Sequence, residues 1–327
     1  MLDVIKELDE WIHNGEEIAL ATVVSTWGSA PRPVGSKMVT TRSGHLAGSV
    51  SGGCVEGAVI EASENIFATG QPQLLNFGIA DEQAWEVGLA CGGTIQIFLE
   101  PFTALEQVYP TLNEHLASRT PVALISVLKG IPGLLNRKLL VDSDANALGN
   151  LEIPGYHDYI LQQATSQLSK GESIIQQLED GTTLFFEFFP PIPRLIIVGA
   201  VHIAQSLAPM ARVAGFETVV IDPRGAFATT ERFQGANKLI KEWPQHVLPE
   251  LDLGRQDFIV VLSHDPKLDD PALQVSLSSN ARYIGALGSR RTHTDRLKRL
   301  QEFGLSDEQL ARIHAPIGLP LGGRSNV

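Results

Sequence analysis

Two glycine-bordered cysteines are the residues in this sequence best suited to chemistry. Cys54 follows Ser51-Gly52-Gly53 and opens a predicted helix, and a helix N-terminus lowers the pKa of a thiol and raises its thiolate fraction. Cys91 precedes Gly92-Gly93 and a predicted strand. Thiolates bind soft metals and carry sulfur. The two motifs predict a functional thiol at Cys54 and a second ligand contact at Cys91, with an inert buried cysteine as the alternative for each.

Four further residues extend this candidate site. Gly52 and Gly53 allow the backbone to approach a ligand closely. Glu56 lies in the first turn of the predicted helix, where its carboxylate orients the loop, accepts a proton or merely complements the helix dipole. Arg32, in the proline-rich loop 28–33, is a candidate partner for an anion, and the alternative for it is a surface turn.

A nucleotide-binding-like turn follows a predicted strand at residues 195–198. The segment Gly199-Ala200-Val201-His202-Ile203-Ala204 matches the pattern G-x-G-x-x-G/A, except that Val201 replaces the glycine that lets a pyrophosphate approach. Asp222 ends the next predicted strand, at the spacing of a ribose-binding acid. The pattern predicts a Rossmann-like fold and makes NAD(P) binding the weaker expectation. In the alternative, Asp222 caps a strand end beside Arg224, which itself either favours a phosphate-bearing ligand or is a surface charge.

A second strand-to-helix turn, residues 285–292, collects residue types that bind anions. Gly288, Ser289 and Arg290 lie where backbone N–H groups and the helix dipole favour a phosphate or a carboxylate, although a solvated basic helix face is the alternative. His264 follows another predicted strand, at the edge of a parallel sheet where ligands bind. A helix-start loop capped by Asp265 explains that segment equally well.

The predicted elements fall into two groups, separated by Pro190-Pro191-Ile192-Pro193. Residues 1–190 are expected to form a mixed α/β domain, and no internal repeat is visible in their sequence. Residues 194–327 alternate strands and helices, which predicts a Rossmann-like domain with a parallel, doubly wound sheet. The fold class is therefore α/β throughout.

Composition limits the classes of function. There are 25 Lys and Arg residues against 37 Asp and Glu residues, and the net charge of −12 disfavours nucleic-acid binding. The charge-free stretch 195–211 is too short and too polar for a membrane span. The first ten residues lack a signal-peptide pattern, and two cysteines do not make a disulfide framework, so we expect a cytoplasmic protein with no membrane partner.

Taken in order, the motifs resemble those of the XdhC/CoxI family of molybdoenzyme accessory factors. Two departures stand out: Val201 replaces a glycine usual in that family, and the chain stops at Val327, from which we expect either a shortened tail or a truncated sequence. The segments that carry the resemblance are Gly28–Arg32, Gly48–Glu56, Cys91–Gly93, Gly199–Ala204, Asp222–Arg224, His264–Lys267, Gly285–His293 and Ile313–Gly318.

The resemblance implies a maturation factor more than a catalyst. Such a factor binds molybdenum cofactor (molybdopterin) and supports its sulfuration and insertion into a xanthine dehydrogenase-type molybdoenzyme. The expected partners are that enzyme, a cysteine desulfurase and a second copy of the chain in a homodimer. In this interpretation the turn at 285–291 takes the phosphate, the glycine loops admit the pterin, and Cys54 coordinates the metal or passes sulfur to it. The ligand is then expected between the two domains.

Three other interpretations stay open at the level of sequence. An NAD(P)-dependent oxidoreductase would use the Rossmann-like domain and Asp222. A sulfur-transfer enzyme would carry a persulfide on Cys54 without any further cofactor. A pure scaffold would dock a desulfurase onto a molybdoenzyme and bind no small ligand.

Overall fold

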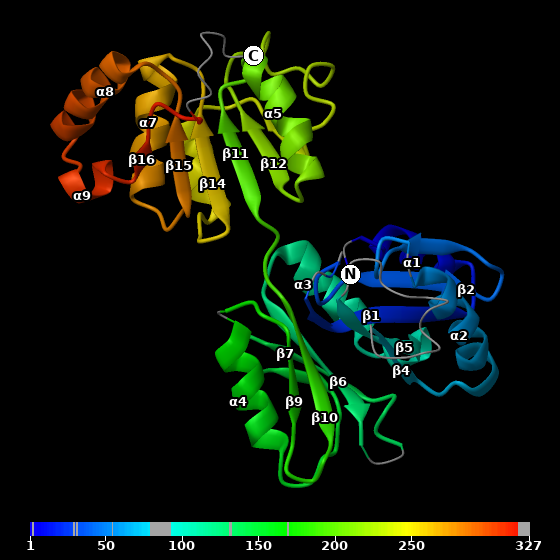
Figure 1. Ribbon diagram of the computed structural model, residues 1–327. Coiled ribbons are helices and arrows are strands. Elements are labelled where there is room, and N and C mark those ends of the chain that lie inside the picture. The colour runs from blue at the N-terminus through cyan, green and yellow to red at the C-terminus, as the bar shows by residue number, and fades with distance from the viewer. Residues whose placement is uncertain are drawn as a thin grey trace. The chain divides into compact units, whose positions relative to one another are not determined.

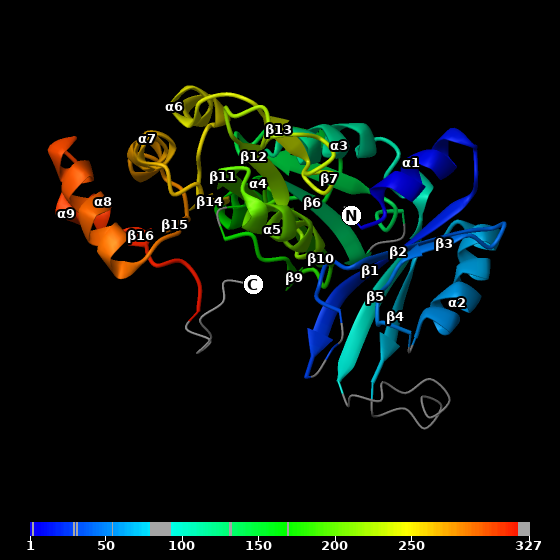
Figure 2. The ribbon, with the colours of Figure 1, turned by 90° about the horizontal axis from the view of Figure 1, so that it is seen from above.

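The chain folds into two compact units, Met1–Pro190 and Pro191–Val327, which are shown in Figures 1 and 2. A computed structural model describes residues 1, 3–28, 30, 32–53, 55–78, 93–130, 133–168 and 170–319. The boundary between the units falls within the proline-rich segment 190–193, where neither a helix nor a central strand can continue.

The first unit consists of two halves with the same topology. Each half runs helix, three strands, helix, two strands, and each forms a five-stranded antiparallel sheet, ordered β3-β2-β1-β5-β4 in the first half and β8-β7-β6-β10-β9 in the second. The first half contains α1 (Ile5–His13), β1 (Ile18–Trp27), β2 (Lys37–Thr41), β3 (Leu46–Gly48), α2 (Glu56–Thr69), β4 (Gln73–Phe77) and β5 (Thr94–Pro101). The second contains α3 (Tyr109–Ser118), β6 (Val122–Lys129), β7 (Lys138–Asp142), β8 (Ala147–Gly149), α4 (His157–Leu168), β9 (Ile174–Gln177) and β10 (Thr183–Phe189), and the short helix η2 (Phe102–Ala104) precedes α3.

The two halves correspond at single positions. Lys37 and Lys138 each begin the second strand of a sheet, and Gly48 and Gly149 each end the third strand. Both glycines have positive φ, and in both a Cβ atom would collide with the carbonyl oxygen of the corresponding lysine. The first unit therefore repeats one topology, which the sequence did not predict because the two halves share few residue identities besides these lysines and glycines.

Each sheet of the first unit is buried on both faces. One face of the first sheet packs against α2 and one face of the second packs against α4. The remaining faces share a third core with α1 and α3. Its buried residues include Val4, Leu8, Leu20 and Val39 from the first half and Val108, Leu112, Leu124 and Leu140 from the second.

Two buried ion pairs connect the halves. The Nζ atom of Lys37 lies 2.6 Å from a carboxylate oxygen of Glu187, and that of Lys138 lies 2.6 Å from Glu100. Burial raises the pKa of Glu100 and lowers the pKa of Lys138 despite the attraction between them. Each half thus supplies the lysine that neutralises the buried carboxylate of the other.

The second unit is a parallel six-stranded sheet ordered β13-β12-β11-β14-β15-β16, which confirms the predicted Rossmann-like architecture. Helix α5 covers one face, and α7 and α8 cover the other. The elements are β11 (Arg194–Val198), α5 (His202–Val213), β12 (Glu217–Ile221), β13 (Lys238–Ile240), α6 (Pro244–Val247), η3 (Leu248–Leu251), β14 (Asp257–Val261), α7 (Pro266–Leu277), β15 (Tyr283–Ala286), α8 (Arg290–Glu302), α9 (Asp307–Leu310) and β16 (Ile313–His314).

Helix α7 begins earlier than the hydrophobic pattern predicts. The pattern places its start at Pro271, but the helix begins at Pro266. The side chain of Asp265 accepts a hydrogen bond from the Lys267 N–H and caps the helix, and proline suits its first position. Pro271 lies inside the helix and does not end it.

Candidate functional site

The connections that carry the predicted thiol site all leave one end of the first sheet. Trp27 at the end of β1 pairs with Thr94 at the start of β5, and Gly48 at the end of β3 pairs with Met38 near the start of β2. Arg32 lies between β1 and β2, while in the sequence Cys54 follows β3 and Cys91 precedes β5. Cys54 and Cys91 themselves lie outside the described residues.

The carboxylate of Glu56 organises the loop that leads to Cys54. It accepts six hydrogen bonds from that loop, two from side-chain hydroxyls and four from consecutive backbone N–H groups, over donor–acceptor distances of 2.5–3.2 Å. The hydroxyl donors are Ser49 and Ser51, and the backbone donors are Val50, Ser51, Gly52 and Gly53.

These hydrogen bonds define what Glu56 does. Partial burial acts to raise its pKa, but the hydroxyls of Ser51 and Ser49 and the backbone donors outweigh burial, so the pKa lies far below its usual range. A carboxylate held in this way is a poor proton acceptor at neutral pH. The geometry therefore favours the loop-orienting role among those expected for Glu56.

Gly52 and Gly53 turn their N–H groups onto that carboxylate. Their φ angles are 82° and 120°, in the region that side-chain-bearing residues rarely adopt. The N–H of Val55, on the other side of Cys54, donates to the Ser51 hydroxyl at 3.0 Å, and the Val55 side chain is fully buried. Both chain neighbours of Cys54 are thus held in place at the start of α2.

Arg32 and Trp27 also lie at this end of the first sheet. The guanidinium of Arg32 donates to the Ser49 carbonyl at 3.2 Å and to the Asp3 carboxylate at 2.8 Å, so its described anionic partner belongs to the chain itself. Sequence reasoning missed Trp27, although a tryptophan directly before Gly28 at a strand end was a usable signal. Its side chain is 71% exposed, which leaves an aromatic surface beside these loops.

In the second unit, the turn after β11 is closed by its own residues. Gly199 has a φ of 107°, and a Cβ atom there would stand 2.9 Å from the Ser263 backbone nitrogen, so only glycine fits. Val201 precedes α5 without a side-chain cap, and His202 is the exposed first residue of that helix. The first glycine of the fingerprint therefore serves packing between the turns after β11 and β14.

Asp222 is engaged by neighbouring residues. Its fully buried carboxylate accepts the Ala200 N–H at 2.7 Å and both a backbone and a two-pronged guanidinium contact from Arg224 at 2.7–2.9 Å. Burial acts to raise the pKa of Asp222, but these donors outweigh it and the pKa lies below its usual range. The arrangement favours the strand-capping alternative for Asp222 over contact with a ribose.

Asp222→Asn should destabilise the protein by roughly 1–3 kcal/mol, because the amide leaves buried donors without acceptors and Arg224 without its counter-charge. Urea denaturation at pH 7 measures the effect, with Glu250→Gln on the surface as the matched control. A ribose-binding role without structural importance would instead leave stability unchanged and abolish a measurable affinity for NADH.

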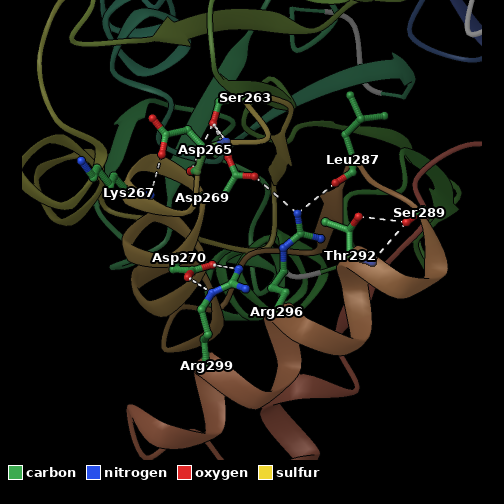
Figure 3. A network of polar contacts seen from close by, with 10 residues as sticks. All are labelled: Ser263, Asp265, Lys267, Asp269, Asp270, Leu287, Ser289, Thr292, Arg296 and Arg299. Atoms are coloured by element: carbon green, nitrogen blue, oxygen red, sulfur yellow. Dashed lines mark hydrogen bonds and ion pairs between the residues drawn. The ribbon is translucent and has the colours of Figure 1, made fainter.

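A buried network underlies the turn that carries Gly288, Ser289 and Arg290 (Figure 3). Arg296 donates to the Leu287 carbonyl at 2.9 Å and lies 3.4 Å from Asp269. Gly288 has a φ of 141°, Ser289 caps α8 by accepting the Thr292 N–H at 3.1 Å, and Arg290 is exposed as the first residue of the helix.

Arg296 is the functional candidate in this unit that sequence reasoning missed, because a charged residue in a basic helix is expected to face solvent. Its side chain is almost fully buried, and its Nε and Nη1 atoms have no hydrogen-bond partner among the described residues. Burial raises the pKa of Asp269, although the Ser263 hydroxyl and Arg296 act in the opposite direction. Exposed His264, with a φ of 61°, follows Ser263 at the same end of the sheet.

No metal-binding cluster of three or more His, Cys, Asp or Glu residues occurs in the described part of the chain. Within the same residues, no helix is long and apolar enough to cross a membrane.

Comparison with known proteins identifies the family of this chain. Residues 195–327 match the XdhC Rossmann domain, and residues 11–78 match the XdhC and CoxI family. The chain belongs to the XdhC/CoxI family. This confirms the resemblance that was inferred from the motifs and their order along the chain. The matched segment 11–78 contains both the Arg32 loop and the Glu56-bound loop.

Relatives of this XdhC/CoxI protein extend over nearly its whole length. It is 29% identical to a Bacillus subtilis protein named as a probable xanthine dehydrogenase subunit, over 96% of this chain and 90% of the relative. It is 28% identical to the molybdenum cofactor insertion chaperone PaoD of Escherichia coli, over 95% and 79% of the two chains. A crystal structure described as a xanthine dehydrogenase from Bacillus halodurans has the same fold, with a TM-score of 0.78, 24% identity and coverage of 98% of this chain and 90% of that one.

Proposed function

We propose that this protein binds molybdenum cofactor as its cargo and supports the sulfuration of that cofactor and its insertion into a xanthine dehydrogenase-type molybdoenzyme. The observation that carries the proposal is the Glu56-bound loop, which fixes both neighbours of Cys54 at the N-terminus of a 14-residue helix. The relative named as a molybdenum cofactor insertion chaperone supports the same cargo.

Cys54 is assigned to the metal end of the cargo. A thiol at a helix N-terminus has an increased thiolate fraction, and a thiolate suits a soft, sulfur-ligated metal centre either as a ligand or as a carrier of sulfur. Cys91 and Arg32, on connections that leave the same sheet end, are assigned to supporting contacts. The exposed ring of Trp27 offers a surface against which a flat pterin can stack.

The turn at Gly288–Arg290 is assigned to an anionic group such as the phosphate of the cofactor. Exposed Arg290 and Arg291 begin α8, whose dipole favours negative charge there, and the buried Arg296 adds a positive charge beneath the turn. His264 lies at the same end of the sheet, as do Gly199, His202 and Arg224 at or after the ends of β11 and β12. A molybdoenzyme, a cysteine desulfurase and a second copy of the chain are the proposed partners.

Cys54→Ser should reduce the molybdenum that copurifies with the protein to less than about a tenth of the wild-type amount, since serine is a far weaker ligand for a soft metal. The full-length protein is purified from cells that make the cofactor. Metal is then measured by mass spectrometry and pterin by fluorescence after release, and transfer is followed as activation of a cofactor-free xanthine dehydrogenase-type enzyme.

Glu64→Gln, on an exposed position of α2, is the matched control and should retain the wild-type amounts. Cys91→Ser and Arg290→Gln test the supporting contacts in the same preparation. Wild-type quantities of metal and pterin in Cys54→Ser, together with full activation of the enzyme, contradict the role assigned to this thiol.

A further inference from the structure

The second half of the first unit contains a counterpart of the Cys54 loop. In each half, seven residues join the third strand to the following helix, namely residues 49–55 before α2 and residues 150–156 before α4. Gly155 takes the position of Cys54, and His157 takes the position of Glu56. The corresponding loop of the second half therefore contains neither the thiol nor the carboxylate that organises the first loop.

The hydrogen bonds of the second loop run differently. The Glu152 carboxylate accepts from the Asn150 amide at 2.7 Å and pairs with Arg137, and the Glu152 N–H donates to the Asn150 side chain at 2.8 Å. A cavity of about 550 Å³ lies where this loop meets the first turn of α4 and the end of β9. Its lining residues are Gly155, Tyr156, Tyr159, Gln177, Leu178 and Glu179.

The lining combines aromatic surface with hydrogen-bond acceptors. The rings of Tyr156 and Tyr159 meet edge to face, with centroids 6.3 Å apart, and both are half-buried. Glu179 supplies a carboxylate and Gln177 an amide, both exposed. Among the described residues, no lysine or arginine lines this cavity, so its wall does not favour an anionic ligand.

A buried acceptor next to the aromatic wall lacks a donor. The Gln176 side-chain amide donates to the Tyr159 hydroxyl, and its Oε1 atom is buried with no hydrogen-bond partner among the described residues. Gln176 is not among the residues that line the cavity, so the contact to Tyr159 positions the ring and the buried Oε1 atom is not counted as a ligand contact.

We propose that this cavity binds a flat, neutral heterocycle with N–H donors along one edge, such as a purine base. The tyrosine rings supply a stacking surface, which every flat heterocycle can use. The Glu179 carboxylate and the Gln177 side-chain oxygen supply acceptors, which select ligands with N–H donors. The inference does not depend on the proposed handling of molybdenum cofactor, because it rests on residues of the other half of the unit.

Isothermal titration of the full-length protein tests the proposal with three probes. Hypoxanthine, which is neutral and carries N–H donors, should bind saturably. Caffeine, a flat purine without N–H groups, should bind at least about tenfold more weakly, and inosine monophosphate should also bind more weakly because Glu179 repels its phosphate. Tyr159→Ala and Glu179→Gln should each weaken hypoxanthine binding at least about tenfold, whereas Glu172→Gln should not change it.

Tyr159→Phe keeps the ring and should retain most of the affinity, which separates loss of stacking from loss of the fold. The proposal is overturned if hypoxanthine shows no saturable binding at millimolar concentration, or if Tyr159→Ala and Glu179→Gln bind it as the wild type does. Molybdenum retention by the same variants should stay at the wild-type level, so a failure here and a failure of the Cys54 assignment are distinguishable.

Discussion

Lys37→Met should lower the free energy of unfolding by about 3–5 kcal/mol, because the Glu187 carboxylate then stays buried without its cation. The lysine also donates to the Thr22 hydroxyl at 3.0 Å, and methionine preserves the length of the side chain but none of its donors. Urea or thermal denaturation of the full-length protein measures the change.

The double variant Lys37→Met/Glu187→Leu should recover most of the lost stability, since an apolar pair of similar volume replaces a buried ion pair at little cost. Lys138→Met provides a matched test at the corresponding position of the second half, and it should destabilise the protein by a similar amount because Glu100 is left unpaired. A double variant as unstable as Lys37→Met alone would show that packing, not charge, dominates at this position.

Glu56→Gln should release the loop that carries Cys54. A glutamine offers one acceptor oxygen and an NH₂ group that repels the backbone donors, so it cannot satisfy the six hydrogen bonds that the carboxylate accepts. Hydrogen exchange at the amides of residues 50–53 should accelerate at least about tenfold, which corresponds to a loss of at least about 1.4 kcal/mol of local stability. Molybdenum retention should fall with it, although Cys54 is unchanged.

The pH dependence of this effect has a definite sign. Because the pKa of Glu56 is lower in the folded protein than in the unfolded chain, its stabilisation is complete above the usual carboxyl pKa of about 4.3 and is lost as the pH falls through the lowered folded value. Wild type and Glu56→Gln should therefore differ fully at pH 7 and converge only in strong acid. Glu61→Gln, on an exposed position of α2, is the control, and equal amide exchange in Glu56→Gln and wild type at pH 7 contradicts the assigned role.

Much of the second unit was predictable because its signals are local. The apolar run 195–198, the glycine at 199 and the regular alternation of strands and helices require a parallel sheet with helices on both faces. The cap at Asp265 was one of two sequence alternatives for that segment, and the structure shows the cap. What local rules did not give is the buried Arg296, because burial of a charged residue depends on its tertiary neighbours.

In the candidate site, too, some features could be predicted from the local sequence and others depend on tertiary contacts. Orientation of the loop was one of three roles that the sequence left open for Glu56, and the hydrogen bonds in the structure favour that one. For Asp222 the sequence left two alternatives, contact with a ribose or capping of a strand end beside Arg224. Only the three-dimensional structure shows that the carboxylate binds Arg224. The repeated topology of the first unit was not visible, since the features its halves share are two lysines, two glycines and a pattern of burial spread over nearly 190 residues.

The exchange of lysines between the two halves of the first unit has a consequence for either half alone. In a chain containing only one half, neither the lysine nor the glutamate would have the direct ion-pair partner that it meets in the other half. Two such chains related by a twofold axis would satisfy both charges at once. The first unit thus pairs its buried charges as a twofold homodimer of such halves would, while only its first half contains the thiol at Cys54.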